Sequence, residues 1–267
     1  MKKILFIGAG NMASAIVGGM LKSNLCSADD IILFDKNTDQ YSKFDNDCKK
    51  AFTLEDGISS ANYIFFSIKP QNIKEILEGI NQFDLSDKLF ISICAGITIQ
   101  SIENVIGANA KIIRTMPNTP LMIGEGVTAL CRNANVSDAD FNFVSSIFSS
   151  SGYVAELKEN EINRITAITS SSPAYLYLFA KAMLDGATQM GITNDNTLEM
   201  ICKTIIGSAK MILSTPTPLD ELIKMVKSPN GTTEKALNVF EEKNFTEIIA
   251  EAMKACADRA DELSGMN

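Results

Sequence analysis

The sequence has no histidine and no tryptophan among its 267 residues. Without histidine it can hold no Ser-His-Asp triad, no histidine general base of the kind found in many alcohol-oxidising dehydrogenases, and no histidine-containing zinc site. The six cysteines are scattered without a CxxC pair, which is typical of reduced thiols in a cytoplasmic protein and predicts no metal site. Any chemistry must therefore depend on other groups.

Basic clusters and long apolar runs are also missing. The chain carries 24 Lys and Arg against 32 Asp and Glu, a formal net charge of −8. Binding a nucleic-acid backbone requires gathered basic side chains, so we expect no nucleic-acid partner. No apolar run reaches the roughly 18 residues of a membrane span, so we expect no membrane partner and a cytoplasmic location. The composition, 46% hydrophobic, predicts a globular protein of one large or two ordinary domains.

In the first half, short β-branched or aromatic runs alternate with helical patterns, which predicts βαβ units and a mostly parallel sheet. The expected strands are residues 4–7, 31–34, 63–68, 89–93, 112–115, 127–131 and 153–155. Apolar side chains at Ile73, Ile76, Leu77 and Ile80 follow the i, i+3, i+4, i+7 spacing of a helix that packs on a sheet. Another helix is expected over residues 137–150.

From about residue 158 the pattern is helical only. The expected helices are residues 174–190, 197–214, 219–226, 233–242 and 246–263. Ser172 and Pro173 precede the first of these as a predicted N-cap and first helical residue. This helix is apolar on most sides and must be covered on most sides, so we expect helix exchange with a second subunit. The predicted domains are residues 1–157 and 158–267.

The first expected strand runs into Gly8-Ala9-Gly10-Asn11-Met12-Ala13 and then into a helix, which is the G-x-G-x-x-G/A pattern in its required context. Gly8 permits a tight turn, Gly10 lets the backbone approach a pyrophosphate, and the helix N-terminus offers N–H groups to the anion. The fold class is therefore α/β, with an N-terminal Rossmann-like doubly wound sheet followed by an all-helical dimerisation domain. We predict cofactor contacts from Gly8, Ala9, Gly10, Asn11 and Met12.

The second expected strand ends at Asp35, 22 residues after Ala13. A carboxylate at this place accepts hydrogen bonds from the ribose 2′-hydroxyl of NAD. Lys36 follows directly and has the charge to attract the 2′-phosphate of NADP. Asp35 and Lys36 are therefore predicted cofactor contacts that leave open the choice between NADP(H) and NAD(H). A plain solvated turn is the alternative interpretation.

Further loops follow other expected strands, where open α/β sheets bind ligands. Each of these residues alone is also consistent with a surface or turn position. Together, on one rim, they predict cofactor contacts from Lys69, Pro70, Cys94, Ala95, Gly96 and Asn118.

In the helical half, Ser228-Pro229-Asn230-Gly231-Thr232-Thr233 precedes a helical pattern. A turn of this kind at a helix N-terminus presents backbone N–H groups and hydroxyls together, which suits a small carboxylate. An ordinary capped turn is the alternative.

Several segments, in this order, carry a resemblance to one enzyme family. They are GAGNMA at 8–13, IKP at 68–70, CAGIT at 94–98, RTMPNTP at 114–120, SSPAY at 171–175, GSAKM at 207–211 and SPNGTT at 228–233. With these segments the chain closely resembles pyrroline-5-carboxylate reductase, the last enzyme of proline biosynthesis, over nearly its whole length.

The resemblance implies reduction of a small imino acid, L-1-pyrroline-5-carboxylate, to L-proline with NADP(H) or NAD(H). It also implies a helical domain interlocked with that of a partner in a dimer, with a ring of dimers in many members. In the family a Ser-Pro-Gly-Gly-Thr-Thr loop binds the substrate carboxylate and ring nitrogen. By resemblance, the substrate-binding residues are Ser228, Gly231, Thr232 and Thr233, with Thr233 the catalytic candidate at the nitrogen.

Three departures from the family pattern affect what can be carried over. Asn230 replaces a glycine of the loop, which asparagine can do in a left-handed backbone. Residues 215–222 read TPTPLDEL in place of the usual His-Pro-Gly segment, so no acidic residue of that segment is carried over. Asp35 stands where NADPH-preferring members more often have a small polar or basic residue.

Two other functions remain open from the sequence. A β-hydroxyacid dehydrogenase depends on a lysine in a Gly-x-x-Lys setting, which Gly207 and Lys210 match superficially. A protein that binds the dinucleotide without turnover is the other alternative, since a fold alone does not establish catalysis.

Overall fold

The computed structural model describes residues 2–44 and 47–265, which form an eight-stranded sheet ordered β3-β2-β1-β4-β5-β6-β7-β8. Among these strands only the β6–β7 pair is antiparallel. The order of the first six is that of the Rossmann fold, which confirms the predicted fold class. The strands are β1 (Ile4–Ile7), β2 (Ile31–Phe34), β3 (Lys49–Lys50), β4 (Tyr63–Phe66), β5 (Leu89–Ser92), β6 (Lys111–Pro117), β7 (Gly126–Arg132) and β8 (Gly152–Glu156).

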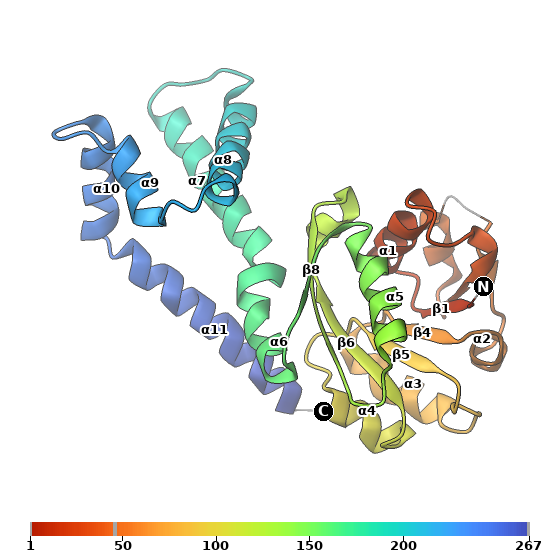
Figure 1. The fold of residues 1–267 in the computed structure, drawn as a ribbon. Coiled ribbons are helices and arrows are strands. Elements are labelled where there is room, and N and C mark those ends of the chain that lie inside the picture. The colour runs from red at the N-terminus through yellow and green to blue at the C-terminus, as the bar shows by residue number, and fades with distance from the viewer. Residues whose placement is uncertain (1, 45–46, 266–267) are drawn as a thin grey trace. The chain divides into compact units, whose positions relative to one another are not determined.

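Helices cover both faces of the sheet (Figure 1). Since successive side chains of a strand point to opposite faces, Phe6 of β1 packs in one core and Leu5 in the other. The first core lies under α1 and α5, and the second under α2, α3 and α4. Both faces are buried, so the central strands are continuous apolar runs. These helices are α1 (Asn11–Lys22), α2 (Leu54–Ser60), α3 (Ile73–Ile80), α4 (Ile99–Ile106) and α5 (Asp138–Ser149).

The second half is helical, as predicted. Its helices are α6 (Glu159–Ile165), α7 (Ser172–Gln189), α8 (Thr197–Ser214), α9 (Leu219–Val226), α10 (Thr232–Glu242) and α11 (Phe245–Gly265). The expected N-cap role of Ser172 is wrong, because a π-helix, Thr166–Ser170, precedes α7 and Ser172 is already helical. The Ser172 hydroxyl instead donates to the carbonyl of Ile168 at 2.6 Å.

The chain divides into two compact units, one of Met1–Pro173 with Ala255–Asn267 and one of Ala174–Lys254. The change from strands to helices falls between β8 and α6, while the predicted domain boundary at residues 157 and 158 stays a prediction. Within the second unit, Leu213 is 87% exposed and Met225 73%. Large apolar side chains exposed in this way are typical of an interaction surface. None of the described helices is long and apolar enough to span a bilayer.

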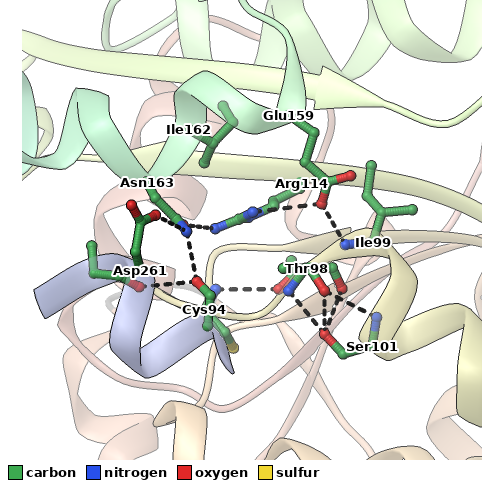
Figure 2. Close-up of polar contacts among 12 residues, drawn as sticks. Cys94, Thr98, Ile99, Ser101, Arg114, Glu159, Ile162, Asn163 and Asp261 are labelled. Carbon is green, nitrogen blue, oxygen red and sulfur yellow. Dashed lines mark hydrogen bonds and ion pairs between the residues drawn. The ribbon is translucent and has the colours of Figure 1, made fainter. Parts of the chain in front are cut away.

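A buried arginine ties several elements of the first unit together (Figure 2). Arg114 on β6 is 1% exposed. Its Nη1 lies 3.5 Å from Oε1 of Glu159, and its Nη2 donates to Oδ1 of Asn163 at 2.5 Å. Burial lowers the pKa of the Arg114 guanidinium, and the charge of Glu159 opposes that shift. The arginine therefore fixes the start of α6 against the sheet.

Glu159 and Asn163 extend this network in two directions. Oε1 of Glu159 accepts a hydrogen bond from the backbone N–H of Ile99, at the start of α4, at 2.6 Å. Nδ2 of Asn163 donates to Asp261 at 2.9 Å and to Ser264 at 2.7 Å, both at the end of α11. The end of α11 is thus hydrogen-bonded to α6 through Asn163, which also accepts from Arg114.

We predict that Arg114→Met destabilises the protein by roughly 2–4 kcal/mol, because the partners of a buried guanidinium are left unpaired. Arg132→Met on β7 is the matched control, since this arginine is partly exposed and its ion pairs with Asp138 and Glu156 are near solvent. The control should cost less than about 1 kcal/mol. Urea unfolding followed by circular dichroism measures both, and equal losses would contradict the role given to Arg114.

Candidate active site

The turn after β1 is shaped by two glycines with different constraints. Gly8 has a φ of +99°, and a Cβ placed on it would lie 2.4 Å from the carbonyl oxygen of Ser67, so only glycine fits. Gly10, the N-cap of α1, faces open space and has no side chain capping the helix. The first turn of α1 also contains no acidic residue. This helix N-terminus therefore presents its backbone N–H groups to an incoming anion.

Asp35, at the end of β2, lies against this turn. Its Oδ2 accepts a hydrogen bond from the backbone N–H of Ala9 at 2.8 Å, and its Oδ1 accepts one from the N–H of Asn37, also at 2.8 Å. The structure thus brings together two predicted cofactor contacts that are far apart in the sequence. The carboxylate both orders the glycine turn and stands at the ribose position of the fold.

Lys36 is exposed beside Asp35, and its Nζ lies 2.6 Å from Oε1 of Glu75, in the first turn of α3. The sequence did not single out Glu75. An acidic residue in the first turn of the expected helix was the available signal, but its pairing with Lys36 depends on the tertiary fold. Asp35, Lys36 and Glu75 line one hollow at the carboxyl ends of β1 and β2.

The other predicted rim residues lie at the ends of β4, β5 and β6. Lys69 and Ala95 are exposed, while Cys94 is buried. Burial raises the pKa of the Cys94 thiol to about 11, and its Sγ donates to the carbonyl oxygen of Ile68 at 3.3 Å. Cys94 is therefore a packed thiol, and only its backbone and its neighbour Ala95 can face a ligand.

Gly96 and Asn118 are both held by neighbouring segments. Gly96 has a φ of +76°, and a Cβ on it would lie 3.3 Å from Leu263 of α11. The side-chain amide of Asn118 donates to the carbonyl of Thr169 at 3.0 Å and accepts from the N–H of Val127 at 2.8 Å. The Asn118 amide therefore braces the loop after β6, and its contact with a cofactor stays a prediction.

In the second unit, the loop before α10 has the backbone that its sequence requires. Asn230 has a φ of +57°, so it takes the left-handed conformation of the glycine that it replaces. A Cβ on Gly231 would lie 2.2 Å from Oγ of Ser228 and 3.0 Å from its carbonyl oxygen, so a side chain at this position would displace the Ser228 hydroxyl. Gly231 is the N-cap of α10 and no side chain caps the helix, which leaves the N–H groups of Thr232 and Thr233 at an open helix N-terminus.

Glu234 holds this loop from inside the first turn of α10. Its Oε2 accepts the N–H of Asn230 at 2.7 Å, and its Oε1 lies 3.3 Å from Nζ of Lys227. The hydrogen bond from Asn230 lowers the pKa of the Glu234 carboxyl. Sequence reasoning missed Glu234, although its place three residues after the N-cap was a usable signal. Thr233 itself lines a largely apolar hollow with Met211, Leu222 and Leu237.

Among the described residues, no group of three or more cysteine, aspartate or glutamate side chains is placed to hold a metal ion. The described residues offer two helix N-termini without a side-chain cap, at α1 and α10, of which only α1 has no acidic residue in its first turn, and a charged hollow beside α1. An anionic group of a dinucleotide suits α1, and a small carboxylate suits α10.

Comparison with known proteins gives a consistent family. Residues 159–263 match the family model described as pyrroline-5-carboxylate reductase dimerisation, and residues 3–96 match the one described as NADP oxidoreductase coenzyme F420-dependent. The pyrroline-5-carboxylate reductase of Escherichia coli is 34% identical over 265 residues, covering 98% of both chains.

Solved structures agree over the same length. A pyrroline carboxylate reductase of Plasmodium falciparum with NADP bound has a TM-score of 0.91 at 29% identity, covering 98% of both chains. A pyrroline-5-carboxylate reductase of Coxiella burnetii has a TM-score of 0.88 at 34% identity, again covering 98% of both. Because sequence and fold match along nearly the entire chain, this protein belongs to the pyrroline-5-carboxylate reductase family.

Proposed function

We propose that this protein reduces L-1-pyrroline-5-carboxylate to L-proline with NADPH or NADH. The observation that carries the proposal is the loop before α10, where left-handed Asn230 and closely packed Gly231 lead into the open helix N-terminus at Thr232 and Thr233. The Escherichia coli relative named pyrroline-5-carboxylate reductase matches 98% of the chain.

Different residues of this loop bind different groups of the substrate. The backbone N–H groups of Thr232 and Thr233 and the hydroxyls of Ser228 and Thr232 bind the carboxylate at the positive end of the α10 dipole, while the N–H of Gly231 donates to the carbonyl of Ser228 and holds the loop. The hydroxyl of Thr233 contacts the ring nitrogen. It accepts a hydrogen bond from the N–H of the iminium before hydride transfer and from the N–H of the amine afterwards. A protonated cyclic imine is already electrophilic, so the protein mainly aligns it and needs no histidine.

The residues of the first unit fit a nicotinamide dinucleotide, because Gly10 opens onto free space at an uncapped helix start. When bound, the cofactor supplies the hydride that the imine carbon accepts. The turn of Gly8, Ala9, Gly10, Asn11 and Met12 would hold the pyrophosphate, and Asp35 and Lys36 the adenine ribose. We keep as proposed contacts the rim residues Lys69, Pro70, Cys94, Ala95, Gly96 and Asn118.

The helical half associates with a second copy. The dimerisation family model covers residues 159–263, and exposed apolar side chains such as Leu213 and Met225 need a covering surface. We propose that residues 1–157 bind the cofactor, that residues 158–267 form an interlocked dimer and bind substrate, and that dimers join in a ring. We further propose a cytoplasmic location, in keeping with six free cysteines, and no nucleic-acid or membrane partner.

The proposed reaction predicts that the purified protein oxidises NADPH or NADH only when L-1-pyrroline-5-carboxylate is present, with proline formed in equal amount. Absorbance at the nicotinamide band together with chromatography of proline measures this. Lys210→Met serves as a control, because Lys210 is exposed on α8 and a hydroxyacid dehydrogenase would depend on it. Bound dinucleotide with no oxidation, or loss of activity in Lys210→Met, would contradict the assignment.

Replacing Thr233 tests the contact with the ring nitrogen. Thr233→Val keeps the shape but removes the hydroxyl, and we expect kcat/KM to fall by about 100-fold. Thr233→Ser keeps the hydroxyl and should stay within about tenfold of the original enzyme. Dinucleotide affinity and unfolding temperature should be unchanged in both. A Thr233→Val enzyme of normal kcat/KM would remove the hydroxyl from the mechanism.

The two glycines of the turn after β1, residues 8–12 and here called the fingerprint turn, should respond differently to alanine. Gly10→Ala puts a methyl where an anion would approach, so dinucleotide Kd should rise at least about tenfold, or about 1.4 kcal/mol. Its unfolding temperature should not change, because that Cβ meets no atom within 4 Å. Gly8→Ala should lower the unfolding temperature, because its Cβ collides with Ser67. Calorimetric titration and thermal unfolding measure these effects, and unchanged affinity in Gly10→Ala would place the pyrophosphate elsewhere.

A further inference from the structure

The hollow beside the fingerprint turn is lined by charged side chains of both signs. Among its described lining residues, the charged side chains are Asp35, Lys36 and Glu75. Two carboxylates and one ammonium give these three groups a net charge of −1. The hollow lies at the carboxyl ends of β1 and β2, where a Rossmann sheet places the adenine ribose.

The ammonium of Lys36 is already paired. Its Nζ lies 2.6 Å from Oε1 of Glu75, which comes from α3, 39 residues further along the chain. Both side chains are about two-thirds exposed, at 67% and 70%, and both line the hollow. Glu75 is also in the first turn of α3, where it uses the positive end of that helix dipole. The negative charge of Glu75 therefore opposes the attraction that Lys36 would exert on a phosphate.

Asp35 cannot turn away to make room for a phosphate. Its two carboxylate oxygens accept the N–H groups of Ala9 and Asn37, each at 2.8 Å, and rotation would break both hydrogen bonds. A ribose 2′-hydroxyl can donate to this fixed carboxylate. A 2′-phosphate would instead bring about −1.5 to −2 charges against it.

We propose that Glu75 is a specificity-determining residue that, by pairing with Lys36 beside the fixed carboxylate of Asp35, makes this enzyme prefer NADH to NADPH. The inference deepens the proposed function and rests on it, since it concerns the dinucleotide site of that reaction. Glu75, unlike Asp35, holds no part of the fingerprint turn, so its charge can be removed without disturbing the pyrophosphate site.

The test is the Kd of NADH and of NADPH, measured separately by titration calorimetry on the full-length protein. The unaltered protein should bind NADH at least about tenfold more tightly than NADPH. Glu75→Gln frees Lys36 and removes one negative charge, so NADPH should bind about tenfold more tightly than before, while NADH changes less than threefold. Adding Lys36→Met to Glu75→Gln should abolish the NADPH gain.

Glu78→Gln is the matched control. Glu78 is the next carboxylate along α3, lies near Lys74 at 4.0 Å, and does not line the hollow, so neither affinity should change. Equal or tighter binding of NADPH by the unaltered protein would overturn the inference. An unchanged NADPH-to-NADH ratio in Glu75→Gln would overturn it as well.

The binding measurement separates this inference from the proposed reaction. NADH preference in a protein that does not turn over L-1-pyrroline-5-carboxylate would support the role of Glu75 and defeat the reaction. Turnover with tighter NADPH binding would support the reaction and defeat the role of Glu75. Failure to bind either dinucleotide would defeat both.

Discussion

The close approach of Gly8 to the carbonyl of Ser67 is the contact on which the first half of the molecule depends. It lets the chain leave β1 and enter α1 in a turn so tight that the helix starts directly above the end of the strand. The N-terminus of α1 then lies just beyond the carboxyl end of β1, and no side chain caps it. Asp35 adds a second tie by accepting the N–H of Ala9. A turn fixed by two neighbouring strands presents its amides without further rearrangement, which is what tight anion binding requires.

In the helical half, the loop before α10 is also an ordered turn that leads into an uncapped helix N-terminus, but it is built from different residues. Gly231 packs closely against Ser228, and Asn230 takes the left-handed conformation before it. Glu234 then pins the loop by accepting the N–H of Asn230, as Asp35 pins the first turn. In both places a carboxylate accepts a hydrogen bond from a backbone N–H of the turn. The result at each site is an ordered loop beside an open helix N-terminus, one suited to a pyrophosphate and the other to a small carboxylate.

The parts of the fold that follow from local pattern were predictable from the sequence. The central strands are buried apolar runs bounded by glycine and polar residues, and α8 and α9 begin and end where the apolar spacing predicts. Features that depend on tertiary contacts were not predictable from the sequence. The two lysines of β3 have no strand pattern and are strand only because they pair with β2. Ser172 has the sequence of an N-cap, but the preceding π-helix continues into α7 and leaves no cap position. At the site, the glycines were predictable from turn chemistry, whereas the pairing of Lys36 with Glu75 joins residues 39 positions apart.

The N-termini of α1 and α3 lie at the same edge of the sheet but differ in whether their first turns contain an acidic residue. The first turn of α1 has no acidic residue, so its dipole is left for a ligand. The first turn of α3 contains Glu75, so its dipole and the nearby Lys36 are already compensated. In the proposed site, the pyrophosphate of a dinucleotide would lie at the N-terminus of α1, which attracts negative charge. Its adenine ribose would lie near the N-terminus of α3, where Glu75 offsets the positive charge. In the proposed site, affinity for the shared part of NADH and NADPH and selection between them would be carried by separate helices, so a change at α3 would alter the choice of cofactor while the binding of its common part at α1 is preserved.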